Sequence, residues 1–94
     1  MKKEDRSDLS QRFRRQRKEL DLIDHRLLTL LNHRFRITFK IGKIKKEIGK
    51  KIYDPRREEE ILKRLKLKNR GPLKDEDLIK IFTTIMRVCR RSQL

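Results

Sequence analysis

A charged side chain interrupts an apolar stripe in the first half of the chain. Between residues 20 and 48 apolar residues recur every three or four positions, and Arg34 stands where the series would place another. This spacing puts the stripe on one face of an α-helix. Because a charged side chain is rarely buried without a partner, Arg34 predicts an anion on this face. The apolar members are Leu20, Ile23, Leu27, Leu30, Ile37, Ile41, Ile44 and Ile48.

Lys45 is a second cation near this face. It follows Arg34 by eleven residues, which is about 20° round the helix and about 16 Å along it, so the two long side chains could converge on one small anion. Further polar residues stand where a second helix would begin and on the inward face of a third. The sequence therefore predicts a polar pocket in a helical bundle, lined by Arg34, Lys45, Asp54, Arg57, Glu58, Cys89 and Gln93.

Each of these residues also has an ordinary explanation. A single arginine in a stripe can set helix register or extend to solvent. Asp54 suits a helix cap, and Gln93, next to the last residue, could lie in a frayed end. His25 and His33 are eight residues apart and predict surface positions and no metal site. The joint occurrence of the polar residues is what favours a functional site.

A long first helix must position the two cations. No proline occurs between residues 10 and 48, and Gly49 is a natural helix stop. A helix of this length spans about 60 Å, too much for two shorter helices to cover. We therefore expect it to pack against a copy of itself or another protein. Residues 1–9 are expected to be a frayed basic segment, and 10–94 one helical domain.

Two short helices complete the predicted fold. Asp54 and Pro55 indicate the start of the second, which should end near the Asn-Arg-Gly-Pro sequence at 69–72. The third should begin around Asp75, with an apolar stripe at Leu78, Phe82, Ile85 and Cys89. No stretch has the alternation of a strand. The predicted class is all-α, with three helices per chain, one long and two short.

The composition points to anionic partners. Lys and Arg number 29 against 14 Asp and Glu, giving a net charge of +15. The apolar fraction of 34% predicts a modest core, which favours oligomerisation. There is no run long enough for a membrane span and no secretory signal, and Cys89 is the single cysteine. Together these features predict a cytoplasmic protein without membrane association.

From about Gln16 to Gln93 the chain resembles the all-helical, AroQ-type chorismate mutases. The stretches that carry the resemblance are short and charged, but their order and spacing match as a set. They are RKELDLID at 17–24, LLNHR at 30–34, IGKIK at 41–45 and IYDPRREE at 52–59, together with the tail at 81–93.

The resemblance implies an intertwined homodimer with two active sites. The long helices would pair antiparallel, and each site would take Arg17 from the other subunit. The spacing agrees with this arrangement, because Arg17 and Arg34 are about 25 Å apart along a helix and roughly 100° apart round it. One small substrate cannot readily touch both from a single straight helix.

The implied reaction is the Claisen rearrangement of chorismate to prephenate, on the shikimate pathway to phenylalanine and tyrosine. It is a one-substrate pericyclic step that needs no cofactor and forms no covalent intermediate. The enzyme would hold the compact reactive conformer and stabilise negative charge on the breaking ether oxygen.

By resemblance, the carboxylates of the substrate would be bound by Arg17 and Arg34, and the ether oxygen by Lys45 and Gln93. Glu58 would accept a hydrogen bond from the substrate hydroxyl.

Three further residues would bind substrate. The backbone near Asp54 would assist at the hydroxyl, and Arg57 would brace the carboxylates. Cys89 stands where the family often has serine, which replaces a good hydrogen-bond donor with a weak one. This departure could weaken the binding of a carboxylate or be harmless.

Three alternatives remain open from the sequence. An isochorismate-pyruvate lyase on the same fold would handle a similar dianion with a similar set of cations. A basic helical nucleic-acid-binding protein would account for the charge, although only non-specific binding is indicated. A coiled-coil interaction protein would account for the stripe but leave Lys45, Glu58 and Gln93 unexplained.

Overall fold

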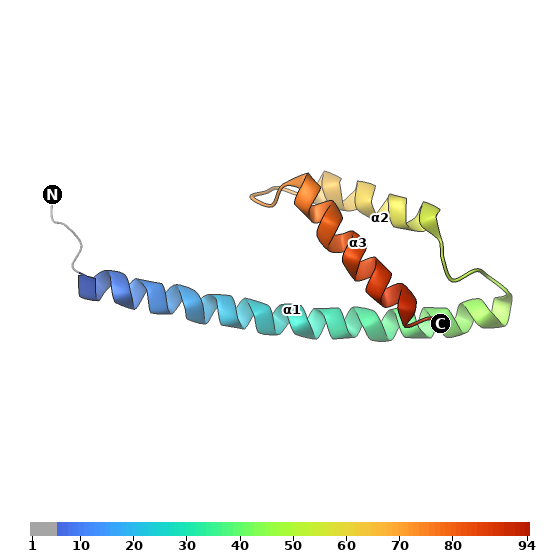
Figure 1. The fold of residues 1–94 in the computed structure, drawn as a ribbon, viewed down its shortest axis with the longest axis horizontal. Coiled ribbons are helices and arrows are strands. Elements are labelled where there is room, and N and C mark those ends of the chain that lie inside the picture. The colour runs from blue at the N-terminus through green and yellow to red at the C-terminus, as the bar shows by residue number, and fades with distance from the viewer. Residues whose placement is uncertain (1–5) are drawn as a thin grey trace. The chain divides into compact units, whose positions relative to one another are not determined.

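The computed structural model describes residues 6–94, which form three α-helices and no strand (Figure 1). The helices are α1 (Arg6–Ile48), α2 (Pro55–Lys68) and α3 (Asp75–Arg91). The all-α class, with one long and two short helices, is therefore confirmed. No helix in the described part of the chain is long and apolar enough to cross a membrane.

The chain divides into two compact units, Met1–Asn32 and His33–Leu94. The described part of the first unit is helical throughout. Its stripe residues Leu20, Ile23, Leu27 and Leu30 are all more than half exposed, so nothing within this unit covers them.

α1 begins at Arg6, before the expected start near residue 10, and Asp8 in its first turn suits the positive end of a helix. The predicted frayed segment overlaps α1 at residues 6–9, and its first five residues lie outside the described part.

In the second unit, the ends of α1 and α2 follow the signals in the sequence. Gly49 adopts a left-handed φ of +74°, which glycine tolerates without strain, and the Lys50 N–H donates to the Lys45 carbonyl at 2.8 Å. Asp54 caps α2 by accepting a hydrogen bond from the Arg57 N–H at 3.1 Å. Pro55 fills the first helical position.

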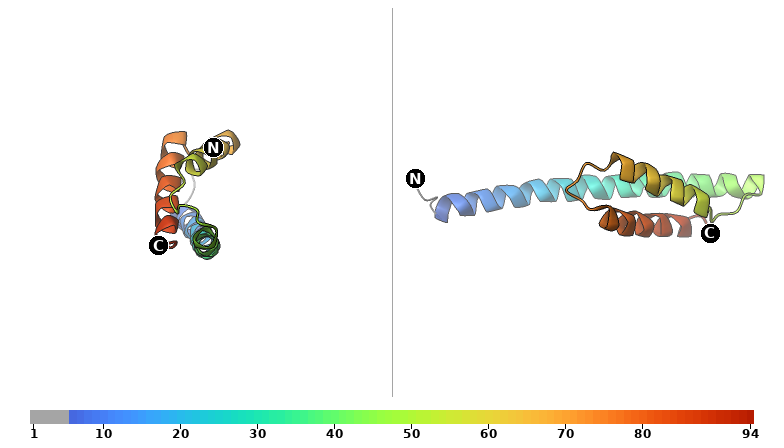
Figure 2. Two further views of the ribbon diagram at one scale, coloured as in Figure 1. Left: turned by 90° about the vertical axis from the view of Figure 1, so that its right-hand side faces the viewer. Right: turned by 90° about the horizontal axis from the view of Figure 1, so that it is seen from above.

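Asn69 organises the turn between α2 and α3. Its side-chain nitrogen donates to the Leu73 carbonyl at 2.7 Å and to the Asp75 carboxylate at 2.9 Å. Its side-chain oxygen accepts from the Gly71 N–H at 3.0 Å. The turn brings α2 and α3 back against each other (Figure 2).

The core of the second unit is small, as the composition predicts. Among the described residues Leu78, Met86 and Cys89 are 5% exposed. Leu78 and Cys89 belong to the predicted stripe of α3, whereas Phe82 and Ile85 are only partly buried. Met86 was not expected here, and its burial shows that the inward face is wider than the stripe.

The chain after α3 closes onto α1 within the same unit. The Ser92, Gln93 and Leu94 N–H groups each donate to the carbonyl three residues earlier, at 3.0–3.3 Å. Gln93 is 8% exposed and lies against Gly42 of α1. The alternative that Gln93 belongs to a frayed end is therefore wrong.

Candidate functional site

A cavity of about 310 Å³ lies in the second unit. Isoleucines from α1, α2 and the connector form much of its apolar wall, with Met86 from α3. The polar residues predicted for this unit all line it. They are Arg34, Lys45, Asp54, Arg57, Glu58, Cys89 and Gln93.

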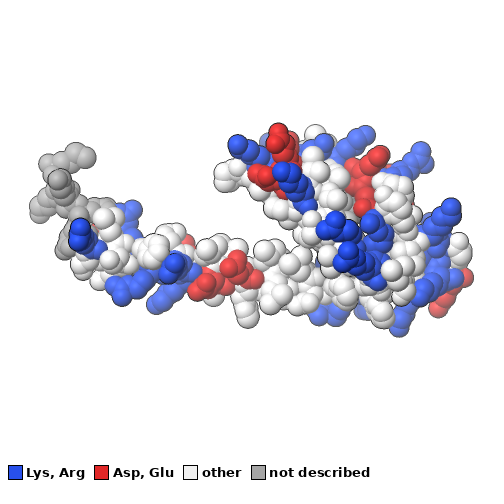
Figure 3. All heavy atoms as spheres, in the orientation of Figure 1, with Lys and Arg blue, Asp and Glu red and all other residues white. Residues whose placement is uncertain are grey.

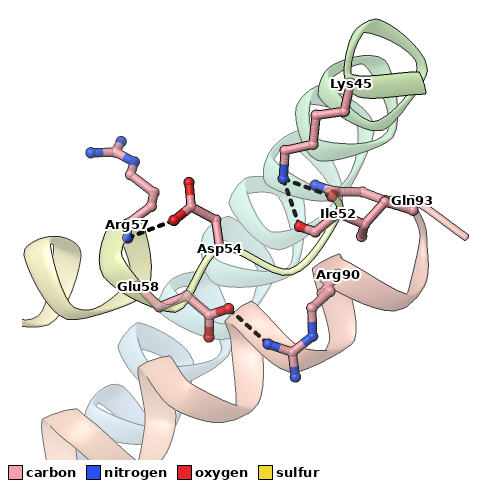
Figure 4. Close-up of polar contacts among 7 residues, drawn as sticks. All are labelled: Lys45, Ile52, Asp54, Arg57, Glu58, Arg90 and Gln93. Atoms are coloured by element: carbon pink, nitrogen blue, oxygen red, sulfur yellow. Dashed lines mark hydrogen bonds and ion pairs between the residues drawn. The ribbon is translucent and has the colours of Figure 1, made fainter. Parts of the chain in front are cut away.

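Lys45 and Gln93, which both line this cavity, are hydrogen-bonded to each other (Figure 4). The Lys45 ammonium donates to the Gln93 side-chain oxygen at 3.1 Å and to the Ile52 carbonyl at 2.7 Å. One of its three N–H donors therefore remains for a ligand. Because the Gln93 oxygen accepts from Lys45, its amide NH₂ is the group left to donate. The pair can present two donors to one partly negative atom.

Glu58 is held by an arginine that the sequence reasoning missed. Its carboxylate accepts from the Arg90 guanidinium at 2.7 Å, and both side chains line the cavity. The guanidinium also lies 4.3 Å from the centre of the Tyr53 ring. One feature of the sequence could have identified Arg90 as a lining residue. It precedes Gln93 by three residues, a spacing that puts both on one side of a helical turn.

Arg34 brings an unsatisfied donor to the cavity. Its Nη1 atom is buried and has no hydrogen-bond partner in the described part of the chain. A buried donor without a partner costs about 1–3 kcal/mol, so an anion that accepts from this nitrogen would relieve a real cost. The prediction that Arg34 faces an anion remains a prediction, and its setting is consistent with it.

The other predicted residues differ in their surroundings. Asp54 caps α2, as expected if it were only a structural residue, and it also lines the cavity. The Arg57 side chain is 52% exposed and lies 3.9 Å from the Glu60 carboxylate. Cys89 is a buried thiol in the cavity wall. Arg17 belongs to the first unit, where its guanidinium lies 4.5 Å from the centre of the Phe13 ring.

The charges round the cavity suit a small dianion. Its lining contains four cations, Arg34, Lys45, Arg57 and Arg90, and two carboxylates, Asp54 and Glu58. The formal balance of +2 would be neutralised by two negative charges. Residues 6–94 contain no group of three or more His, Cys, Asp or Glu side chains placed to hold a metal ion.

Comparison with known proteins relates this chain to one family. The model of the family described as chorismate mutase type II matches residues 16–94. A solved structure of chorismate mutase (form II) from Thermus thermophilus superposes with a TM-score of 0.86 at 38% identity. The superposition covers 87% of this chain and 93% of that one.

Two curated relatives are longer proteins. The bifunctional chorismate mutase/prephenate dehydratase of Neisseria gonorrhoeae is 37% identical over 73 residues, which cover 78% of this chain and 20% of that protein. The protein of the same name from Aquifex aeolicus is 36% identical over 77 residues, which cover 78% of this chain and 21% of that protein. This chain therefore spans about a fifth of the length of these relatives.

Proposed function

Because the chain belongs to the chorismate mutase type II family, we propose that it catalyses the rearrangement of chorismate to prephenate in the biosynthesis of phenylalanine and tyrosine. The observation that carries the proposal is the cavity of the second unit, where the predicted cations, carboxylates and amide converge and, together with Arg90, give a formal charge of +2. Chorismate is a dianion of small size. We also infer that the reaction takes place in the cytoplasm.

The Lys45–Gln93 pair would stabilise the transition state. As the ether bond breaks, negative charge grows on its oxygen, and preorganised donors aimed at such an atom lower the barrier. Lys45 offers its remaining N–H, and Gln93 offers its amide NH₂. Since each is already fixed by the hydrogen bond between them, little reorganisation is needed during the reaction.

Arg34 would bind a substrate carboxylate. Its guanidinium can donate two parallel hydrogen bonds to a carboxylate, and its buried Nη1 atom lacks a partner in residues 6–94. Arg57, more exposed at the rim, would add positive charge. Together they would select the compact conformer in which the two reacting ends of the substrate are close.

Glu58 would accept a hydrogen bond from the substrate hydroxyl. One carboxylate oxygen is occupied by Arg90, which leaves the other for this purpose. The backbone near Asp54 and the thiol of Cys89 would complete the polar wall. The proposed mechanism uses no cofactor, since the rearrangement moves electrons within a single substrate.

We further propose that the active form is a homodimer in which Arg17 of one chain completes the site of the other. The exposed stripe of α1 supports this, because Leu20, Ile23, Leu27 and Leu30 form an apolar face that a single chain does not bury. A second copy of α1 would cover it. Arg17 would then supply the second guanidinium for the two substrate carboxylates.

Nucleic-acid binding is a weaker explanation of the charge. On the face drawn in Figure 3, Lys and Arg side chains are spread over both units instead of forming one continuous patch. Such a distribution favours only non-specific attraction, which weakens steeply with salt. The cavity residues would have no role in it.

The test is an ultraviolet assay of chorismate consumption with identification of the product, at two salt concentrations. Prephenate formed faster than in the uncatalysed reaction is the expected result. Arg34→Ala should lose this activity, and Arg36→Ala, an exposed neighbour on α1, is the matched control. Pyruvate release from isochorismate without prephenate formation would replace the mutase with the lyase. Absence of both activities from a folded protein would overturn the proposal.

A further inference from the structure

We propose that Arg90 is a positioning residue of this site: it orients the Glu58 carboxylate and offsets its charge so that a dianion can bind beside it. The inference rests on the proposed function. It assigns a role to a residue that the sequence pattern did not single out.

The contact between the two side chains is close and partly shielded. The Arg90 Nη1 atom lies 2.7 Å from the Glu58 Oε2 atom, and the side chains are 30% and 23% exposed. Figure 4 shows the pair bridging from α3 to α2. Charge-assisted hydrogen bonds of this length are strong and directional, so Arg90 restrains the orientation of the carboxylate. The other oxygen, Oε1, has no hydrogen-bond partner in residues 6–94.

Arg90 is itself held in place from two sides. The Tyr53 ring lies 4.3 Å from the guanidinium carbon, a distance at which a cation is attracted to the ring face. The Arg90 carbonyl accepts the Gln93 N–H at 3.0 Å, at the base of the turn that carries Gln93. The residue is therefore fixed by both the connector before α2 and the end of α3.

Charge explains why Glu58 needs this partner. A lone carboxylate in the cavity would repel each negative group of a dianionic substrate, and the repulsion is stronger in a partly buried site than in water. Arg90 cancels that repulsion while leaving one carboxylate oxygen to accept from a hydroxyl. Loss of Arg90 should therefore impair substrate binding more than the chemical step.

The test compares KM and kcat for chorismate in four proteins: the full wild-type chain, Arg90→Met, Glu58→Gln and the double variant. Arg90→Met should raise KM by roughly tenfold to a hundredfold, with a smaller fall in kcat. Glu58→Gln removes the negative charge that is left uncompensated when Arg90 is absent. It keeps a side-chain oxygen that can accept a hydrogen bond from the substrate hydroxyl. The double variant should therefore have a KM that returns most of the way from the Arg90→Met value to the wild-type value.

A purely structural role would not produce this recovery, since two substitutions at a packing contact would damage it further. Arg87→Met is the matched control, because it removes one positive charge from an exposed position on the same helix. An equal rise in KM in this control, a normal KM in Arg90→Met, or a double variant worse than Arg90→Met would each overturn the proposal. Failure of the wild-type chain to convert chorismate would instead overturn the proposed function.

Discussion

Gly42 lies directly against Gln93. A Cβ atom added to residue 42 would lie 2.7 Å from the Cβ, 2.8 Å from the Cγ and 2.9 Å from the Cα of Gln93. These distances are shorter than van der Waals contact, and one of them involves the backbone. The absence of a side chain at Gly42 thus allows the last turn of the chain to reach α1 and bring Gln93 to Lys45.

Gly42→Ala should separate helix stability from activity. Alanine favours a helix over glycine by about 1 kcal/mol, so the intrinsic stability of α1 should rise. The added methyl should displace Gln93, and kcat should fall by about tenfold or more. Circular dichroism and steady-state kinetics would measure the two effects. Lys46→Ala, at an exposed position on α1, controls for an ordinary change of helix surface. Unchanged kcat in Gly42→Ala would contradict the proposed role of Gln93.

Local signals in the sequence explain how much of the fold could be predicted. Asp54 and Pro55 mark the start of α2, and Gly49 marks the end of α1, because caps and stops depend on neighbouring residues. The lining residues were predicted through an arginine that interrupts an apolar stripe and through a family resemblance.

Contacts between distant segments could not be predicted in the same way. As an interior glycine of a helix, Gly42 predicts only a cost in helix propensity. Its contact with Gln93 depends on how the end of α3 packs. The ion pair between Arg90 and Glu58 likewise depends on how α2 and α3 lie against each other. In a chain with 29 Lys and Arg residues, composition gives no reason to choose Arg90 among them.

Arg34→Ala and Lys45→Ala should each reduce kcat/KM by about a hundredfold or more while the protein stays folded. Arg34→Ala removes the guanidinium that would donate two hydrogen bonds to a substrate carboxylate. Lys45→Ala removes both a donor to the ether oxygen and the hydrogen bond that fixes Gln93. Arg34→Lys should recover little, because an ammonium cannot donate two parallel bonds. Kinetics and circular dichroism on the same samples would test this. Near-normal activity in a folded variant would refute the role of the residue concerned.

The pH profile should distinguish an amide from a carboxyl group at position 93. Gln93 does not titrate, so wild-type activity should persist from neutral to mildly alkaline pH. In Gln93→Glu only the protonated acid can donate to the ether oxygen, and the carboxylate would oppose its growing charge. Activity of this variant should therefore rise as pH falls. Profiles of kcat/KM would test both expectations, and a steep wild-type loss between about pH 6 and 8 would argue against this site assignment.

Cys89→Ser tests whether the buried thiol limits the site. A hydroxyl is a better donor than a thiol, and residue 89 lines the cavity. If a substrate carboxylate lies within its reach, KM should fall by about twofold to tenfold. Cys89→Ala is the matched control, since it removes the polar atom altogether. Equal KM values in all three proteins would mean that this position does not contact the substrate.

Mixed dimers would test whether Arg17 acts across an interface. Arg17→Ala and Arg34→Ala should each be inactive alone, because every site lacks one guanidinium. When the two variants are unfolded together and refolded at equal amounts, half of the dimers should be mixed, and each mixed dimer has one site with both arginines. About a quarter of the wild-type activity should therefore return. The same variants refolded separately and then mixed without exchange are the control. No recovery in a verified mixed dimer would mean that Arg17 does not complete the partner's site.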